Sequence, residues 1–321
     1  MGDRRHPMAG ERGRHRRRHH RAAWRRGSSS DPECSAAAGS SWLGGLFRRL
    51  VDGLPWSERA ERTETRTFAC PERPCLRIDN ANGRTRVVGE DRDDIEVRIQ
   101  KTARAESPEA AEALLDQIDL AARTGEEGLA LEVEIPRRWN RRGSAHLDIR
   151  VPRGLGVELQ ASNGKVCIEG LRGRVRARAS NGGVRVANVM GDVEILTSNA
   201  KVACSRVCGR VLAQSSNGKI ELEAVRGSVD ACTSNGLIFA SLEAVGPEGV
   251  LLTTSNGRIV LELPEEVDAD VDMRVDNGVI RSERRLEGAR RSASAHRLRG
   301  VLGRGGTAIR LRTSNGSISL R

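Results

Sequence analysis

The sequence predicts an all-β fold, a parallel β-helix or β-solenoid with 18-residue coils, over the second half of the chain. Three observations predict it. A turn dipeptide, Asn-Gly with one Asn-Ala, recurs every 18 residues from Asn163 to Asn235. Val or Ile follows most of these asparagines at offsets of three and twelve residues. Aromatic residues make up only 2% of the chain, so small and β-branched side chains must fill the interior. This registry indicates one coil per repeat, with two strands and two turns.

The turn asparagines are expected to lie in one column, where their side chains can hydrogen-bond from coil to coil as in other polar ladders. Beyond Asn235 the spacing lengthens to 21 and then to 38 residues. Because Ala200 replaces the usual glycine, we expect it to avoid the left-handed conformation or to accept mild strain. The expected column consists of Asn163, Asn181, Asn199, Asn217, Asn235, Asn256, Asn277 and Asn315.

The N-terminal region is expected to hold a tail and a helix. Residues 1–41 lack any apolar period, which predicts a disordered, arginine-rich tail. Ten arginines against two acidic residues in residues 1–26 account for +8 of the formal net charge of +11. Residues 42–56 are expected to form a short amphipathic helix. Its apolar face holds Trp42, Leu43, Leu46, Phe47 and Leu50.

Three roles for this tail and helix stay open. The helix can cap an open end of the solenoid, which repeat proteins require. An amphipathic helix beside a cationic cluster also supplies the two signals that stable binding to an anionic membrane surface needs. A protein or nucleic-acid partner is the third role, but Trp24 is the tail's only aromatic residue, which argues against nucleic acid.

Residues 66–152 predict a mixed β module with strands on both sides of the turn Asn82-Gly83. One short helix is expected at about 108–120, with Ser107 as its N-cap and Pro108 as its first residue. The apolar face expected for this helix consists of Ala110, Ala113, Leu114 and Ile118.

The solenoid is expected over residues 153–321. Residues 281–305 lack the turn dipeptide and are expected to form an irregular coil or an inserted loop. The repeat resumes at Ile309 and runs to Leu320. We expect this last strand to leave an open sheet edge, through which the chain could self-associate.

The residues that could carry chemistry do not converge in the sequence. His146 and His296 are the histidines outside the tail, and surface positions are expected for both. Cys204 shares an inward column with apolar residues and is expected to pack in the core, whereas a metal or disulfide role for Cys70 and Cys75 stays open. The carboxylates fall on different columns. We therefore predict no enzyme activity, no cofactor and no metal site. These carboxylates are Glu169, Asp192, Glu194, Glu221, Glu223 and Asp230.

One outward column repeats a positive charge two residues after the asparagine. Such a row could bind a polyanion, or it could prevent edge-to-edge stacking as lysines do on exposed strands. Its members are Lys165, Lys201, Lys219 and Arg258.

The Ser-Asn-Gly turns, the segment from Leu76 to Ile99 and the ending from Gly305 to Gly316 resemble a bacterial β-strand-repeat family. This family is domain of unknown function 4097, labelled "putative adhesin". The resemblance covers about residues 66–321 and implies a parallel β-helix. It implies no catalytic residue.

These observations together predict a non-catalytic binding or scaffold protein that engages a protein or a cell-envelope component. A peripheral membrane stress-response protein held by the basic N-terminus and a surface adhesin are the alternatives. No apolar run of about 18 residues and no signal-peptide pattern is present, so we expect a cytoplasmic protein. Two locations stay open: free in the cytoplasm, or bound peripherally to the inner membrane.

Overall fold

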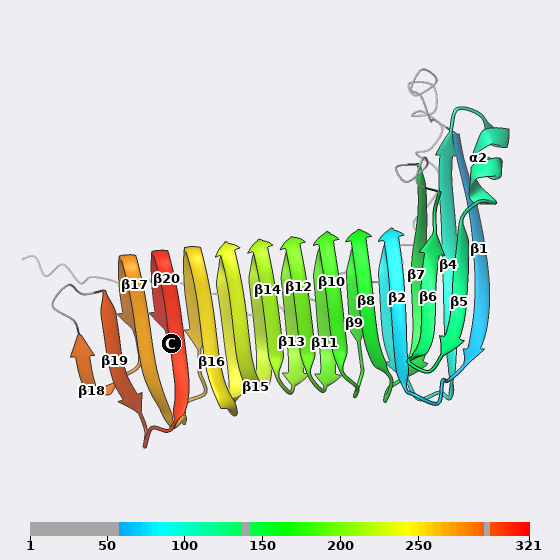
Figure 1. Cartoon of the computed structure of the whole chain (residues 1–321). Helices are drawn as coiled ribbons and strands as arrows, with labels where there is room; N and C mark the ends of the chain where they lie inside the picture. Colours follow the sequence, from blue (N-terminus) through cyan, green and yellow to red (C-terminus); the bar gives the residue numbers. More distant parts are fainter. Residues whose placement is uncertain (1–57, 137–141, 292–295) are drawn as a thin grey trace, which may run out of the picture. The chain divides into compact units, whose positions relative to one another are not determined.

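The computed structural model describes residues 58–136, 142–291 and 296–321. The tail expected at residues 1–41 and the helix expected at residues 42–56 lie outside the described residues. The described residues are almost entirely β-strand (Figure 1). Their one helix, α2, has eight residues, and no helix among them is long and apolar enough to cross a membrane.

The regular coils each contribute one strand to each of two parallel rows. In the first row, β10 (Val175–Asn181) lies between β8 (Gly156–Asn163) and β12 (Val193–Asn199), with partners 18 residues apart. In the second row, β11 (Val184–Met190) lies between β9 (Val166–Glu169) and β13 (Val202–Cys208). The rows continue through β14 (Val211–Asn217), β15 (Ile220–Asn235) and β16 (Ile238–Glu262). The predicted solenoid with 18-residue coils is confirmed.

The core is built from stacked columns of identical or similar side chains. Alternate residues of each strand point inward, because successive side chains of a strand point to opposite faces. Ile168, Val186, Cys204 and Leu222 form one such column, and each is at most 1% exposed. Burying each of these side chains contributes roughly 1.5–3 kcal/mol to the hydrophobic stabilisation of the fold. The packing role expected for Cys204 is confirmed.

Three consecutive strands of the second row each contain one residue in the left-handed conformation, and no pattern in the sequence indicates this feature. Asn188, Arg206 and Ala224 are spaced by 18 residues and have φ angles of 54°, 52° and 53°. This left-handed conformation places two consecutive residues outward. The strand then returns to the core with buried Val189, and Val207 in the next coil.

The first coil in the sequence does not lie at the end of the stack. Its strands β2 (Cys75–Asn82) and β3 (Thr85–Glu90) lie between the β8–β9 coil and a later coil, β6 (Gly128–Glu134) and β7 (Gly143–Pro152). Antiparallel strands extend this end. They are β1 (Glu58–Ala69) on β4 (Asp94–Ala105), β4 on β7, and β5 (Asp119–Gly125) on β6.

Helix α2 (Pro108–Leu115) begins where the sequence indicates but ends about five residues early. The Ser107 hydroxyl accepts a hydrogen bond from the Ala110 N–H at 3.2 Å, which caps the helix. The expected apolar face was right for Leu114 and Ile118, which are buried, and wrong for Ala110 and Ala113, which are exposed. The face of the helix that packs on β1 and β4 is shifted by one residue from the expected face, so that Ala111 is buried in place of Ala110. Its buried residues are Ala111, Leu114 and Leu115.

The last strand of the chain is also inserted into the stack. Strand β20 (Thr307–Leu320) lies between β16 and β17 (Ala269–Ser282) and pairs with both in parallel. The open edge expected at Leu320 was therefore wrong: Leu320 faces Leu261 on one side and Ser282 on the other. Residues 281–305 were expected to be irregular but contain two strands. These are β18 (Glu287–Arg291) and β19 (Arg297–Leu302), which extend β17 in antiparallel pairing.

Candidate binding surface

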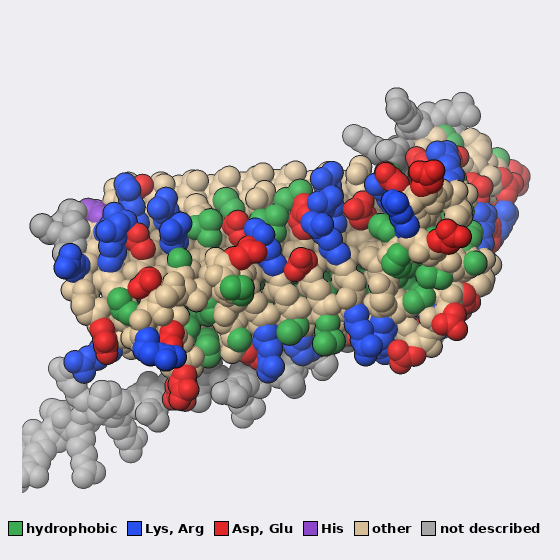
Figure 2. All heavy atoms as spheres, turned by 60° about the horizontal axis from the view of Figure 1, so that its bottom comes forward, with side chains coloured by type: hydrophobic (Ala, Val, Ile, Leu, Met, Phe, Trp, Pro, Cys, Tyr) green, Lys and Arg blue, Asp and Glu red, His purple; other side chains and the backbone are tan. Residues whose placement is uncertain are grey.

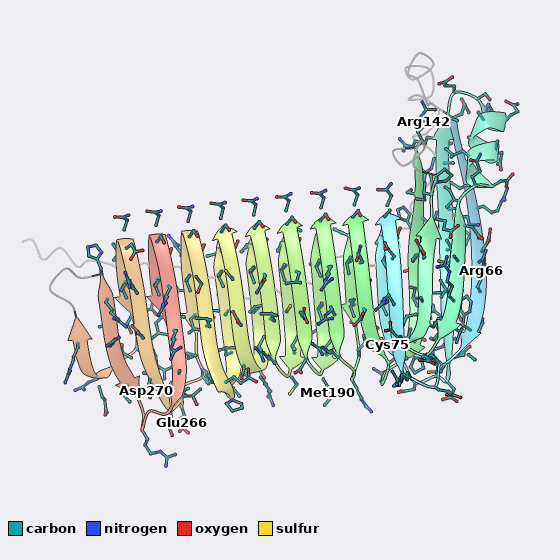
Figure 3. All side chains as sticks on the ribbon, viewed as in Figure 1. Arg66, Cys75, Arg142, Met190, Glu266 and Asp270 are labelled. Atoms are coloured by element: carbon teal, nitrogen blue, oxygen red, sulfur yellow. The ribbon has the colours of Figure 1, made fainter. Side chains whose placement is uncertain are left out.

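Nine asparagines stand in single file along the edge where the first row of strands turns into the second. Apart from the first member, Asn82, each asparagine donates a hydrogen bond from its Nδ2 to the Oδ1 of the preceding member, at 2.8 to 3.4 Å. Figure 3 shows a row of side chains above the strand tips. Every asparagine of the expected column lies in this file. The order along the file is Asn82, Asn163, Asn181, Asn199, Asn217, Asn235, Asn256, Asn315 and Asn277.

Two features of this file escaped the sequence analysis. Asn82 belongs to it, but five strands and a helix lie between the strand of Asn82 and the strand of Asn163, so the 18-residue period does not connect them. Asn315 precedes Asn277 because β20 is inserted before β17. Ala200 has no positive φ angle and so avoids the left-handed conformation, whereas Gly182 in the equivalent position has a φ of 139°.

A shallow groove of about 340 Å³ lies beside the asparagine file on β8, β10 and β12. Three serines, one per coil, line one side of it: Ser162, Ser180 and Ser198. Gln160 and Arg178 supply an amide and a guanidinium on the same outward face, and Leu196 supplies an apolar contact. Hydroxyl, amide and guanidinium groups can donate hydrogen bonds in fixed directions, so the groove suits a polar, extended ligand.

The expected cation row is partly neutralised within the fold. Lys201 Nζ lies 2.6 Å from a carboxylate oxygen of Glu221, and Lys219 pairs with the same carboxylate. Burial opposes ionisation of Glu221, but the hydrogen bonds from both lysines lower its pKa. Lys165 and Arg258 lie on coils to either side. Polyanion binding by this row stays a prediction.

The scattered carboxylates act as links between neighbouring coils. Glu194 lies 2.9 Å from Arg176 on the adjacent strand and 3.3 Å from Arg174. Asp192 accepts a hydrogen bond from the Arg210 N–H one coil away, at 3.1 Å. Exposed pairs of this kind contribute roughly 0–1 kcal/mol each. Their arrangement suits alignment of the coils rather than glycoside hydrolysis, which typically uses two carboxyls that face one substrate.

A cavity of about 680 Å³ lies at the opposite edge of the first coils, and no pattern in the sequence indicates it. The turn before β2 and the hairpin between β5 and β6 line it. Arg77 on its wall lies 3.3 Å from Glu158 and 3.5 Å from Glu127. Cys75 lies at this edge (Figure 3), and burial followed by the charge of Glu158 raises the pKa of its thiol. A protonated thiol is a poor nucleophile and metal ligand.

The remaining candidate groups are spread through the structure. Cys70 and Cys75 both have free thiols, and the described part of the chain holds no group of three metal-ligating side chains. His146 was expected at the surface but is half-buried. Its Nδ1 accepts a hydrogen bond from the Arg84 N–H at 2.9 Å, and burial and then the charge of Arg84 lower its pKa. His296 is exposed. The apolar face expected at residues 42–50 lies outside the described residues.

Three solved structures match this chain at low sequence identity and low TM-score. One, described as "a putative cell adhesion protein" from Clostridium sporogenes, is 8% identical with a TM-score of 0.30. The others are "a putative adhesin" from Bacteroides fragilis, at 12% and 0.40, and a "putative lipid binding protein" from Parabacteroides distasonis, at 13% and 0.38. The matches cover 81% of this chain and 99%, 97% and 97% of the others.

A search of curated proteins gave no match. A family model described as Toastrack DUF4097 matches residues 75–321, which is the range from β2 through the last strand. The resemblance drawn from the Ser-Asn-Gly turns is confirmed. The chain belongs to the Toastrack DUF4097 family.

Proposed function

We propose that the chain is a non-catalytic scaffold that binds a protein or a cell-envelope component along its first row of strands. The groove on β8, β10 and β12 carries this proposal. It presents hydroxyl, amide and guanidinium groups at regular strand spacing, on a surface held in place by stacked coils. A ligand that meets a preorganised surface loses less conformational freedom in the complex, so binding is favoured.

The rigidity of that surface has a direct cause in the backbone. A Cβ added to Gly182 would lie 2.1 Å from the carbonyl oxygen of Gly164 in the preceding coil. Coils can approach this closely only where the turn has no side chain. The file of asparagine hydrogen bonds then ties each turn to the next. The serines of the groove are therefore held at constant spacing.

The carboxylate geometry supports a binding role over a hydrolytic one. Glu194, two residues before the groove residue Leu196 on β12, is paired with two arginines, and its side chain is only 16% exposed. A purified chain that hydrolysed polysaccharide or ester substrates, and lost that activity on Glu194→Gln, would contradict the proposal.

Two variants test the groove. Ser180→Trp places a large side chain in the middle of the groove, and Ser234→Trp places the same side chain at the equivalent position three coils away. A photoactivatable cross-linker at residue 160 of the full chain should form one defined adduct in cells. Ser180→Trp should abolish this adduct and Ser234→Trp should preserve it. Adducts unaffected by Ser180→Trp would exclude the groove as the binding site.

We propose that the N-terminal region tethers the scaffold to a membrane. The basic tail and the helix predicted for residues 42–56 would recruit the scaffold to an anionic membrane surface, and the scaffold would then lie at the cytoplasmic face of the inner membrane. Flotation with anionic vesicles tests this step: the full chain should float and a chain without residues 1–54 should not. A surface adhesin remains the alternative, and the chain would then be recovered outside the cell on fractionation.

A further inference from the structure

A cluster of arginines covers the outward face of the last four strands in the stack, β20, β17, β19 and β18. We call it the C-terminal arginine patch. Figure 2 shows Lys and Arg side chains gathered at this end of the molecule, at the left of the view. The sequence analysis did not identify it. The patch consists of Arg274, Arg290, Arg297, Arg299, Arg310 and Arg312.

The arginines form two rows that cross the strands. One row places Arg312, Arg274 and Arg297 side by side on β20, β17 and β19. The other row, two residues away along each strand, holds Arg310, Asp272, Arg299 and Arg290. Strands lie about 4.8 Å apart and rise about 3.3 Å per residue, so the strip is about 14 Å long with about 7 Å between its rows.

The carboxylates in the strip are too few to neutralise it. Asp272 lies 2.6 Å from Arg297 and 3.4 Å from Arg299. Arg274 lies 3.3 Å from Asp276, which is outside the two rows. Within the described residues, Arg310 and Arg312 are exposed and have no carboxylate within 4 Å.

In the middle of the solenoid, the coil position of Arg310 holds an arginine that is paired with carboxylates. Arg176 and Arg178 on β10 occupy the coil positions of Arg310 and Arg312, as the strand registers show. Arg176 lies 2.9 Å from Glu194 and 3.8 Å from Glu158 on the two adjacent strands. The solenoid can therefore pair an arginine at the position of Arg310, and at β20 it does not. Among the described residues, Arg178 has no carboxylate within 4 Å, like Arg312, so the contrast concerns Arg310 alone.

The row of Arg312, Arg274 and Arg297 also has an energetic cost. Like charges directly opposite each other on neighbouring strands destabilise a sheet. Arg312 lies beside Arg274, which lies beside Arg297. A neutral residue at position 312 would relieve this repulsion, and so would an external anion bound between the arginines.

We propose that the C-terminal arginine patch binds an extended polymer with a phosphate in each repeat unit, lying across the strands between the two rows. The planar guanidinium fork matches phosphate oxygens in pairs. The patch contains no aromatic side chain, and single-stranded nucleic acids are bound by stacking of bases on aromatic residues. The ligand class is therefore a phosphate polymer without bases.

The surroundings of the strip favour a narrow ligand over a membrane. Asp276 is exposed beyond one row, and Asp270 and Glu287 are exposed beyond the other. A broad anionic surface would meet these carboxylates, whereas a single chain between the rows would not. The strip is separate from the groove on β8, β10 and β12. A variant that removes binding at one of these surfaces therefore leaves the other surface intact, and the two proposals can be tested independently.

Fluorescence anisotropy with labelled inorganic polyphosphate tests the proposal. The protein is the full chain with the ten arginines of residues 1–26 replaced by Gln, which removes binding by the tail. Adding Arg310→Gln and Arg312→Gln should weaken binding about tenfold, since two exposed charge pairs are lost. The slope of log affinity against log salt should fall by about 1.4, which is about 0.7 for each lost phosphate contact. The matched control, Arg98→Gln with Arg104→Gln, removes two exposed arginines of β4 that lie outside both the groove and the patch, and it should leave both quantities unchanged.

Two results would overturn the proposal. If Arg310→Gln with Arg312→Gln binds polyphosphate as tightly as its parent, the patch is not the site. If polyglutamate or vesicles of anionic phospholipid bind more tightly than polyphosphate through the same two arginines, the partner is an acidic peptide or a membrane instead. Urea unfolding should show that the double variant is at least as stable as its parent, because the substitution relieves charge repulsion.

Discussion

The asparagine file makes a graded prediction about stability. Asn217 takes part in two hydrogen bonds of the file: its Nδ2 donates to Asn199 at 3.0 Å, and its Oδ1 accepts from Asn235 at 2.8 Å. Asn277 is the last member within the described residues and donates to Asn315 at 3.0 Å. An intramolecular hydrogen bond contributes about 1 kcal/mol net to stability. Asn217→Ala should therefore lower the free energy of unfolding by about 2 kcal/mol, and Asn277→Ala by about 1 kcal/mol.

Urea unfolding followed by circular dichroism measures these differences. Asn217→Asp provides an intermediate case, because the carboxylate still accepts from Asn235 but no longer donates to Asn199. The matched control is Ser216→Ala, a neighbouring exposed side chain outside the file, for which a loss below about 0.5 kcal/mol is expected. If Asn217→Ala and Ser216→Ala cost the same, the file contributes nothing to stability and the reasoning is wrong.

Three further predictions concern the backbone, a buried ion pair and a buried thiol. Gly182→Ala should cost about 4 kcal/mol in urea unfolding, because the strained φ angle and the collision with the preceding coil each cost roughly 1–3 kcal/mol. Glu64→Gln should lower stability at pH 7 by about 2 kcal/mol, because it removes the charged hydrogen bond to buried Lys101, 2.8 Å away. This hydrogen bond lowers the folded pKa of Glu64 below its ordinary 4.5, so the loss should shrink as the pH falls below 4.5, and a loss independent of pH would contradict the assignment. Burial raises the pKa of Cys204 to about 12, so at pH 8 a maleimide should modify exposed Cys208 and leave Cys204 unmodified until the chain unfolds, as mass spectrometry of the peptides can show.

The regular part of the fold could be predicted from the sequence because its contacts are periodic. Each strand in the middle of the solenoid pairs with residues 18 positions away, so the side chains that stack, such as Val175 and Val193, also recur at that spacing. The two ends could not be predicted in this way. Strand β20 pairs with residues 38 positions earlier on β17 and 59 positions earlier on β16, and neither distance is a multiple of 18.

The same distinction explains which parts of the candidate surfaces were found. The asparagines and serines repeat with the coil, so they were visible as columns. The C-terminal arginine patch was not, because Arg274, Arg297 and Arg312 become neighbours only through the insertion of β20 and the antiparallel pairing of β19. The 680 Å³ cavity arises between strands β2 and β6, whose pairing has no periodic signal in the sequence.

Chemical cross-linking of paired cysteines tests the stacking order directly. Ser255, Ser314 and Asp276 each precede an asparagine of the file, on β16, β20 and β17. In a chain without other reactive cysteines, a thiol reagent about 5 Å long, one strand spacing, should join Ser255→Cys to Ser314→Cys. It should also join Ser314→Cys to Asp276→Cys. Efficient joining of Ser255→Cys to Asp276→Cys, with none to Ser314→Cys, would show that the coils stack in chain order and would contradict the account.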